Sequence, residues 1–293
     1  MKPPAFDYAA PDTLAEVLAL LARHGDTARP LAGGQSLVPV LNLRLASPGL
    51  LVDLNRVTEL RGIRVDATGT LIIGATTRHR AVELSPEVAR CNPLLAAAMP
   101  WIAHVQIRNR GTHGGSLAHA DPSAELPAVA LASDAELEIA GPSATRRVAA
   151  NAFFQGLFAT ALGAGELLVA ARYPAWPARR RCGFIEVARR HGDYAIAGVA
   201  VTVDIDESAS VTATRVVLFG VGDAPQRAHA VEAGLAGAPL SAATIHRAAT
   251  HAADGLDARS DLHASAEYRR ELAVVLTRRA LEQTLAPRRA DAT

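Results

Sequence analysis

Two short glycine-rich segments hold the residues of this chain that are best suited to binding chemistry. The first reads Ala-Gly-Gly-Gln-Ser over residues 32–36, and the second reads Gly-Thr-His-Gly-Gly-Ser over residues 111–116. Adjacent glycines let a backbone approach a ligand closely and adopt positive φ. Successive N–H groups can then converge on an anion, and hydroxyls at the rim add donors. Two such loops brought together predict a pyrophosphate site, which is typical of a dinucleotide cofactor.

The two segments differ from the common nucleotide-binding signatures. Neither reads GxGxxG or GxxxxGK[ST], which excludes the Rossmann and P-loop motifs at the level of residues. In a chain with 22 glycines, a single Gly-Gly-Xaa-Ser match is as compatible with ordinary turn chemistry as with phosphate binding. The surrounding sequence has to decide between these two interpretations.

The composition allows two domains of ordinary size and argues against a dedicated polyanion binder. The chain has 293 residues, of which 49% are hydrophobic. Its 30 Lys and Arg residues nearly balance 29 Asp and Glu residues, and a net charge of +1 argues against a nucleic-acid binder. Cys91 and Cys182 form no CxxC pair and no HExxH motif occurs, so neither an iron–sulfur cluster nor another metal is expected. Without a signal core or a membrane-spanning stretch, the protein is expected to be cytoplasmic.

The elements around the glycine segments read as a small α/β unit followed by a larger mixed one. Thr13 and Glu16 form a capping box before a leucine-rich helix that Gly25 ends. The pattern then predicts strands over 29–31, 50–54 and 70–75, helices over 80–88, 93–104, 124–133 and 151–157, and a hairpin of 136–140 with 145–149. Ser123 is the expected N-cap of the helix over 124–133.

Prolines over 173–178 predict a linker, and the pattern changes beyond it. Strands over 182–190, 195–205 and 212–221 are long enough to form a meander, and helices follow over 229–235, 242–253 and 264–285. The predicted fold class is therefore α+β, with one domain over residues 1–177 and a second, made of an antiparallel sheet and helices, over residues 178–293.

Five segments, in order along nearly the whole chain, resemble one known family. They are residues 31–53, 106–130, 160–168, 189–197 and 260–269. This sequence is similar to the FAD-binding medium subunit of the molybdenum hydroxylases, the family of carbon monoxide dehydrogenase and xanthine dehydrogenase. The resemblance implies a two-lobed FAD-binding domain of the vanillyl-alcohol-oxidase or PCMH type, followed by the C-terminal domain of the carbon monoxide dehydrogenase flavoprotein.

The resemblance also implies roles for individual residues. Backbone amides of the two segments would cradle the FAD pyrophosphate, through Ala32, Gly33, Gly34, Gln35, Ser36, Thr112, His113, Gly114, Gly115 and Ser116. Tyr194, in a Gly-Asp-Tyr sequence, would shield one face of the isoalloxazine ring, and Asp121 and Glu125 would contact the ribose or adenine side. Two positions depart from the family: His113 replaces the usual Ile, Val or Leu, and Ser116 stands where Asn is also common. His113 is expected either to add a donor near the phosphates or to point to solvent.

The function implied is electron transfer within a larger complex. Substrate would be hydroxylated at molybdenum in a large subunit, and electrons would pass through two [2Fe–2S] clusters of a small subunit to FAD here, then to a final acceptor. The expected assembly is a dimer of heterotrimers, and no catalytic side chain is expected in this chain; Asp53 is interpreted as a hydrogen-bonding carboxylate. Two alternatives remain: a stand-alone FAD-dependent oxidase or dehydrogenase with its own acid/base residue, and a non-catalytic assembly subunit without flavin.

Overall fold

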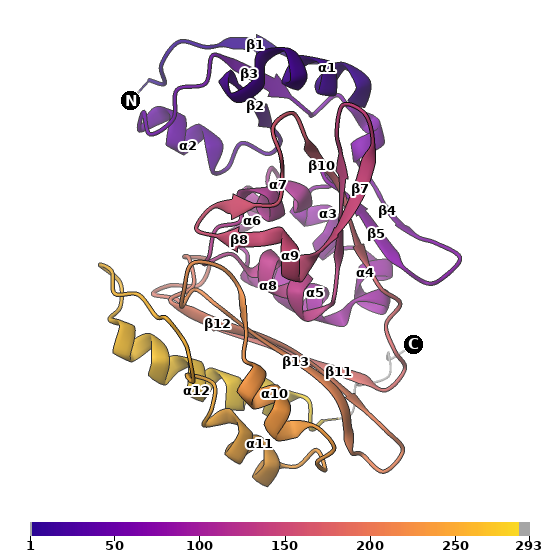
Figure 1. Cartoon of the computed structure of the whole chain (residues 1–293), viewed down its shortest axis with the longest axis vertical. Coiled ribbons are helices and arrows are strands. Elements are labelled where there is room, and N and C mark those ends of the chain that lie inside the picture. Colours follow the sequence, from indigo (N-terminus) through magenta and orange to yellow (C-terminus); the bar gives the residue numbers. More distant parts are fainter. Residues whose placement is uncertain (1, 287–293) are drawn as a thin grey trace.

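The computed structural model describes residues 2–286, so residues 287–293 of the second expected domain lie outside the described residues. Figure 1 shows three parts that follow one another along the long axis of the molecule. We call them the first lobe (residues 2–57), the second lobe (residues 58–176) and the C-terminal part (residues 177–286).

The first lobe is the small α/β unit that the sequence predicts. Its strands β1 (Asp7–Ala9), β3 (Leu50–Asp53) and β2 (Ala28–Leu31) form a parallel sheet in that order. Helix α1 (Leu14–His24) begins with the predicted capping box, and it buries Val17 and Leu21 against the sheet. A 3-10 turn (Gly25–Thr27) and a short helix α2 (Leu37–Asn42) complete the lobe, and α2 comes directly after the first glycine segment.

The second lobe is built on an antiparallel five-stranded sheet. Its order is β4-β5-β10-β6-β7, with bounds β4 Ile63–Val65, β5 Leu71–Gly74, β10 Leu167–Tyr173, β6 Glu136–Ala140 and β7 Thr145–Ala149. A two-stranded hairpin, β8 (Phe154–Gly156) with β9 (Ala159–Thr160), lies beside it. Its helices are α3 His79–Glu83, α4 Pro86–Cys91, α5 Pro93–Ala98, α6 Val105–Arg108, α7 His113–His119, α8 Glu125–Ala132 and α9 Ala150–Phe153, with 3-10 turns at Thr58–Leu60 and Met99–Trp101.

The predicted helices of the second lobe are shorter than expected. Pro86 breaks the helix expected over 80–88, since the residue before a proline disfavours helical φ/ψ and Ser85 is extended. The helix expected over 93–104 ends at Ala98 and passes into the 3-10 turn Met99–Trp101, which contains Pro100. The helix expected over 151–157 ends at Phe153, where β8 begins. Ser123 was wrong as an N-cap: the cap is Ala124 without a side-chain bond, because the Ser123 amide donates to Asp121 Oδ1 (2.9 Å) in a turn.

The C-terminal part is the predicted meander with helices on one face. Strands β11 (Arg180–Val187), β12 (Ala197–Ile205), β13 (Val211–Phe219) and β14 (Gln226–Arg227) pair antiparallel in sequence order. Helices α10 (His229–Leu235), α11 (Ala242–Ala249) and α12 (Ala266–Gln283) cover the face turned away from the second lobe (Figure 1). The predicted linker lies between β10 and β11, and the α+β fold class is confirmed.

The meander joins two cores because successive side chains alternate between its faces. Val199, Val201 and Leu218 pack with the helices of the C-terminal part. Ala200 and Phe219 belong instead to the core of the second lobe, which also contains Leu126 and Val129 of α8. Thus the second lobe and the C-terminal part share one continuous hydrophobic core.

Candidate cofactor site

The structure brings the two glycine segments into contact at the junction of the two lobes. A Cβ on Gly33 would lie 2.8 Å from Gly111 Cα, and one on Gly115 would lie 3.6 Å from the Ala32 Cβ. The position of Gly33 has no room for a side chain, so glycine is required there for the segments to meet. At Gly115 the distance to Ala32 is an ordinary contact, and the close neighbour is Thr112 Oγ1 of the same turn. The meeting point joins the end of β2 in the first lobe to the start of α7 in the second.

The first segment forms an open cradle of amides. Gly34 has φ of 73°, which turns the chain between β2 and α2, and its carbonyl accepts from Val38 N (3.0 Å). Within residues 2–286, the N–H groups of Gly33, Gly34, Gln35 and Ser36 donate to no protein acceptor. Consecutive free amides beside a helix start are what an anion requires. This segment therefore has the chemistry of a phosphate site.

The second segment is not a second cradle of that kind. Its residues form the first turn of α7, with Thr112 as N-cap accepting from Gly115 N (3.2 Å). The other three amides also have acceptors: His113 N on Thr77 O and Gly114 N on Ala75 O (both 2.9 Å), and Ser116 N on Thr112 O (3.1 Å). The two segments are therefore not equivalent: bonds within the protein already use the amides of residues 113–116, whereas the Thr112 amide donates to no acceptor among the described residues. Gly115 and the half-buried Ser116 hydroxyl remain to face a ligand.

His113 lies in neither of the two places expected for it. It is fully buried, and its Nε2 lies 2.8 Å from the Tyr173 hydroxyl, with the two rings edge to face. Burial lowers the pKa of His113 to about 3, so the imidazole is neutral. It occupies a core position, where an aliphatic side chain would also fit the surroundings. Both expectations for His113 were therefore wrong.

Tyr194, Asp121 and Glu125 lie close to the first segment. Tyr194 is 66% exposed in the loop between β11 and β12. The pKa of its hydroxyl is raised by desolvation and by the charges of Asp121 and Glu125, and a hydrogen bond with Ser36 lowers it. These interactions place the Tyr194 hydroxyl within reach of both lobes. The half-buried Asp121 and the buried Glu125 thus border the same region as Ser36.

The loop that carries Tyr194 is held against the second lobe. The His191 ring stacks on Trp101, with centroids 5.5 Å apart and an interplanar angle of 24°. Gly192, at φ of 88°, passes so close to His104 that a Cβ would lie 2.8 Å from the ring. The position of Tyr194 is therefore set by contacts from outside its own part of the chain.

Sequence reasoning missed Glu186, a buried carboxyl of β11. It shares the face of Phe184, which contacts the core of the second lobe, and neither of its carboxyl oxygens has a hydrogen-bond partner. Burial and the nearby Glu125 raise the pKa of Glu186 to about 9, and burial raises that of Glu125 to about 7. A charged residue at an inward position of a strand was the available signal.

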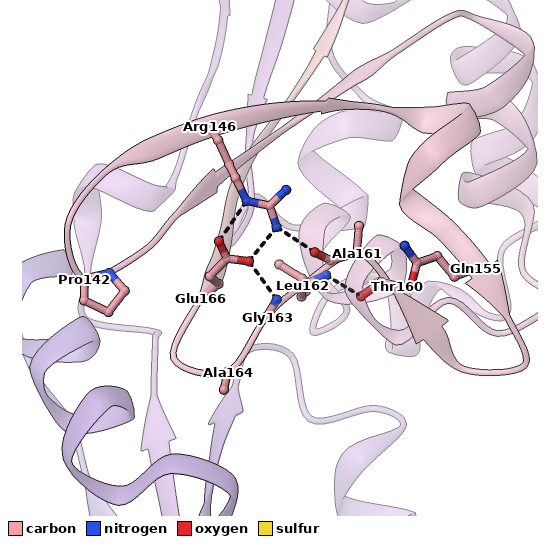
Figure 2. Close-up of a pocket in the computed structure, with 9 residues that line it drawn as sticks. All are labelled: Pro142, Arg146, Gln155, Thr160, Ala161, Leu162, Gly163, Ala164 and Glu166. Carbon is pink, nitrogen blue, oxygen red and sulfur yellow. Dashed lines mark hydrogen bonds and ion pairs between the residues drawn. The ribbon is translucent and has the colours of Figure 1, made fainter.

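A separate cavity of about 500 Å³ lies at the edge of the second lobe (Figure 2). It is lined by Pro142, Arg146, Gln155, Thr160, Ala161, Leu162, Gly163, Ala164 and Glu166, none of which is a predicted site residue. Figure 2 shows the Arg146–Glu166 ion pair across it, and both side chains also bind the backbone of the turn at Ala161 and Gly163. Gly165 in this turn borders Ala22 of α1.

Neither a metal site nor a membrane helix is found in the part of the chain that the structure describes. No group of three or more His, Cys, Asp or Glu side chains between residues 2 and 286 could hold a metal ion. Likewise, none of the helices within that range has both the length and the apolar character needed to cross a bilayer.

Comparison with known proteins assigns both halves of the chain. Residues 4–176 match the family described as the FAD binding domain in molybdopterin dehydrogenase, and residues 183–284 match the CO dehydrogenase flavoprotein C-terminal domain. The chain is 43% identical to the 6-hydroxypseudooxynicotine dehydrogenase complex subunit alpha of Paenarthrobacter nicotinovorans, over 97% of this chain and 96% of that one. It is 38% identical to the carbon monoxide dehydrogenase medium chain of Afipia carboxidovorans, over 98% and 99% of the two chains.

The fold agrees with a solved structure of the same kind. A chain of the carbon monoxide dehydrogenase of Hydrogenophaga pseudoflava superimposes with a TM-score of 0.94 at 39% identity, covering 97% of this chain and 99% of that one. These findings confirm FAD as the cofactor and an oxidoreductase subunit as the class of protein. The chain belongs to the family of FAD-binding medium subunits of the molybdenum hydroxylases.

Proposed function

We propose that this chain holds FAD at the meeting point of its two glycine segments and serves as the electron-transfer subunit of a heteromeric molybdenum hydroxylase. The observation that carries the proposal is the row of four amides, from Gly33 to Ser36, that have no acceptor in the protein. The residues present therefore fit an anionic dinucleotide. FAD, when bound, supplies the redox chemistry, because a flavin can exchange electrons one or two at a time.

Each residue of the site then has a defined task. The amides of Gly33, Gly34, Gln35 and Ser36 bind phosphate oxygens. Ala32, at the start of the segment, positions it against the second lobe. On the other lobe the small surface of Gly115 lets the cofactor approach and the Ser116 hydroxyl donates. Thr112 fixes the turn, and the buried Gly114 packs against Ala75. Tyr194 shields one face of the flavin ring, and Asp121 and Glu125 border the ribose or adenine side. His113 supports the turn from within the core.

The partners follow from what the relatives are called and from what this chain lacks. Its relatives are named as subunits of complexes, and its two cysteines cannot ligate an iron–sulfur cluster. We propose a large molybdenum-cofactor subunit and a small [2Fe–2S] subunit as its partners, in a cytoplasmic dimer of heterotrimers. We also propose that the FAD-binding domain ends at residue 177, where β10 has ended and β11 has not begun.

The first experiment is to purify the chain, record its visible absorption spectrum and identify any cofactor released by heat. One FAD per chain, without iron–sulfur absorbance, is the expected result. Turnover of a substrate without partners would favour the stand-alone oxidase instead. A colourless chain that takes up no added FAD would overturn the proposal in favour of an assembly subunit.

A matched pair of glycine variants tests the two-segment site itself. Gly33→Ala places a methyl group against the Arg110–Gly111 backbone and should abolish tight FAD binding, since the segments can no longer touch. Gly49→Ala, in the same lobe, meets its neighbours at an ordinary 3.7 Å and should leave binding unchanged. Equal FAD affinity of the two variants, measured by titration of the cofactor-free chain, would contradict the assignment.

A further inference from the structure

One hydrogen bond between side chains joins the two lobes beside the glycine segments. Asn55, which follows β3 in the first lobe, accepts from Arg78 Nη2 of the second lobe at 2.5 Å. Asn55 Nδ2 also donates to Ala32 O (3.0 Å), the carbonyl at the start of the first segment. Arg78 Nη1 donates to the carbonyl of Arg110, directly before the second segment. The pair therefore spans the junction from one segment to the other.

The orientation of Asn55 is fixed by its neighbours. Asp53 Oδ1 accepts from both the backbone N (2.9 Å) and the Nδ2 (2.5 Å) of Asn55, which leaves the amide oxygen to face Arg78. Tyr8 donates to the other carboxylate oxygen of Asp53. Arg61 of the second lobe adds a second bond across the junction, from its Nη2 to Asn55 O (2.9 Å). A side chain so fully bonded loses little further freedom when the lobes close on a ligand.

The charges around this bond favour an anion. Within the described residues Arg78 forms no ion pair with a carboxylate, and its two bonded acceptors are an amide and a carbonyl. Burial and the neighbouring charges of Arg110 and Arg61 lower the pKa of Arg78. The nearby carboxylate of Asp53 acts in the opposite direction and raises this pKa. The three arginines, Arg61, Arg78 and Arg110, still outnumber this one carboxylate where the cofactor's phosphates are expected, so a bound anion would relieve their repulsion.

We propose that Asn55 and Arg78 act as positioning residues, forming a latch that holds the two glycine segments at the spacing FAD requires. This inference rests on the proposed function, because it assumes that the cofactor bridges the segments. Arg78→Gln and Asn55→Ala should each raise the Kd for FAD by about 10- to 100-fold, the range expected for a hydrogen bond to a charged group. Arg78→Lys, which keeps the charge and one donor, should recover part of that loss.

The test is a double-mutant cycle on FAD binding by the full chain, measured by fluorescence titration and by the visible circular dichroism of the bound flavin. Arg172→Gln is the matched control: this half-buried arginine of the second lobe pairs with Asp66, away from the segments. The control should lower the melting temperature while its Kd stays within about twofold of the wild type. For a latch, the double variant should bind about as weakly as each single variant.

Two results would overturn the latch while leaving the cofactor site intact. One is wild-type affinity in Arg78→Gln, and the other is a double variant whose loss equals the sum of the two single losses. A wild-type chain that binds no FAD would instead refute the proposed function, so the two failures can be told apart.

Discussion

At the scale of single residues, the buried carboxyl of Glu186 makes the stability of the chain depend on pH. Its pKa is raised from 4.5 to about 9, so the folded chain holds a proton that the unfolded chain releases over this range. Stability should therefore fall as the pH rises from about 5 to 9, by up to about 1.4 kcal/mol per pH unit. Glu186→Gln should flatten this slope and be more stable than the wild type at pH 8.

Urea unfolding of the cofactor-free chain at pH 5, 7 and 9 measures that slope. The exposed Glu271→Gln is the control and should leave it unchanged. A wild-type slope in Glu186→Gln would mean that the carboxyl of Glu186 is ionised in the folded chain.

His113 allows a second test at this scale. Its place in the sequence suggested cofactor binding, whereas the structure places its side chain in the core. His113→Leu should leave the Kd for FAD within about twofold, because the ring faces the core. It should cost about 1–3 kcal/mol at pH 7, since the Tyr173 hydroxyl loses its partner. The difference in stability between the variant and the wild type should shrink toward pH 5. Because the pKa of His113 is lowered in the folded chain, the wild type loses stability as the pH falls below 6.5, and the variant lacks this loss. A tenfold loss of FAD affinity in His113→Leu would show that His113 contributes to cofactor binding.

At the scale of elements, the loop between β11 and β12 depends on its anchor. Gly192→Ala should push the loop away from His104 and change the fluorescence and circular dichroism of bound flavin, because Tyr194 moves with it. Gly237→Ala is the matched control: it has a similar positive φ of 71° but nothing within 4 Å of the added Cβ. Both should lose about 1 kcal/mol from backbone strain, and only Gly192→Ala should alter the flavin signals. Identical flavin spectra of Gly192→Ala and Gly237→Ala would show that Tyr194 does not contact the flavin.

The elements also show what could be predicted from the sequence. The capping box at Thr13, the hairpin of β6 and β7 and the long meander strands depend on local patterns, and all were predicted. The contact between the glycine segments is long-range: the pair of loops suggested it, and the resemblance to a family supported it. The acceptors of the His113 and Gly114 amides could not be predicted, because Thr77 and Ala75 lie far away in the sequence. The burial of Glu186 could not be predicted, because its face of β11 packs against the second lobe, which is distant in the sequence.

At the scale of the whole molecule, the shared core predicts that the second lobe and the C-terminal part unfold together. Thr202 Oγ1 donates to Ala132 O (3.0 Å), and Gly220 N donates to Pro122 O (2.7 Å), so polar contacts reinforce the core. Far-ultraviolet circular dichroism and the fluorescence of Trp101 should give coincident urea transitions. Phe219→Ala should destabilise that single transition by about 3–5 kcal/mol. Two separated transitions would show that the parts fold independently.

The order of strands in the five-stranded sheet has a consequence for synthesis. β5 pairs with β10, which the ribosome makes about one hundred residues later (Leu71 with Tyr173). Until β10 arrives, β5 is paired on the β4 side alone and the partner of His113 is missing, and closing so long a loop is entropically costly. The first glycine segment is therefore complete in the first lobe before Tyr173 and then Tyr194 have been synthesised. Cofactor capture is consequently a late event in the life of each new molecule.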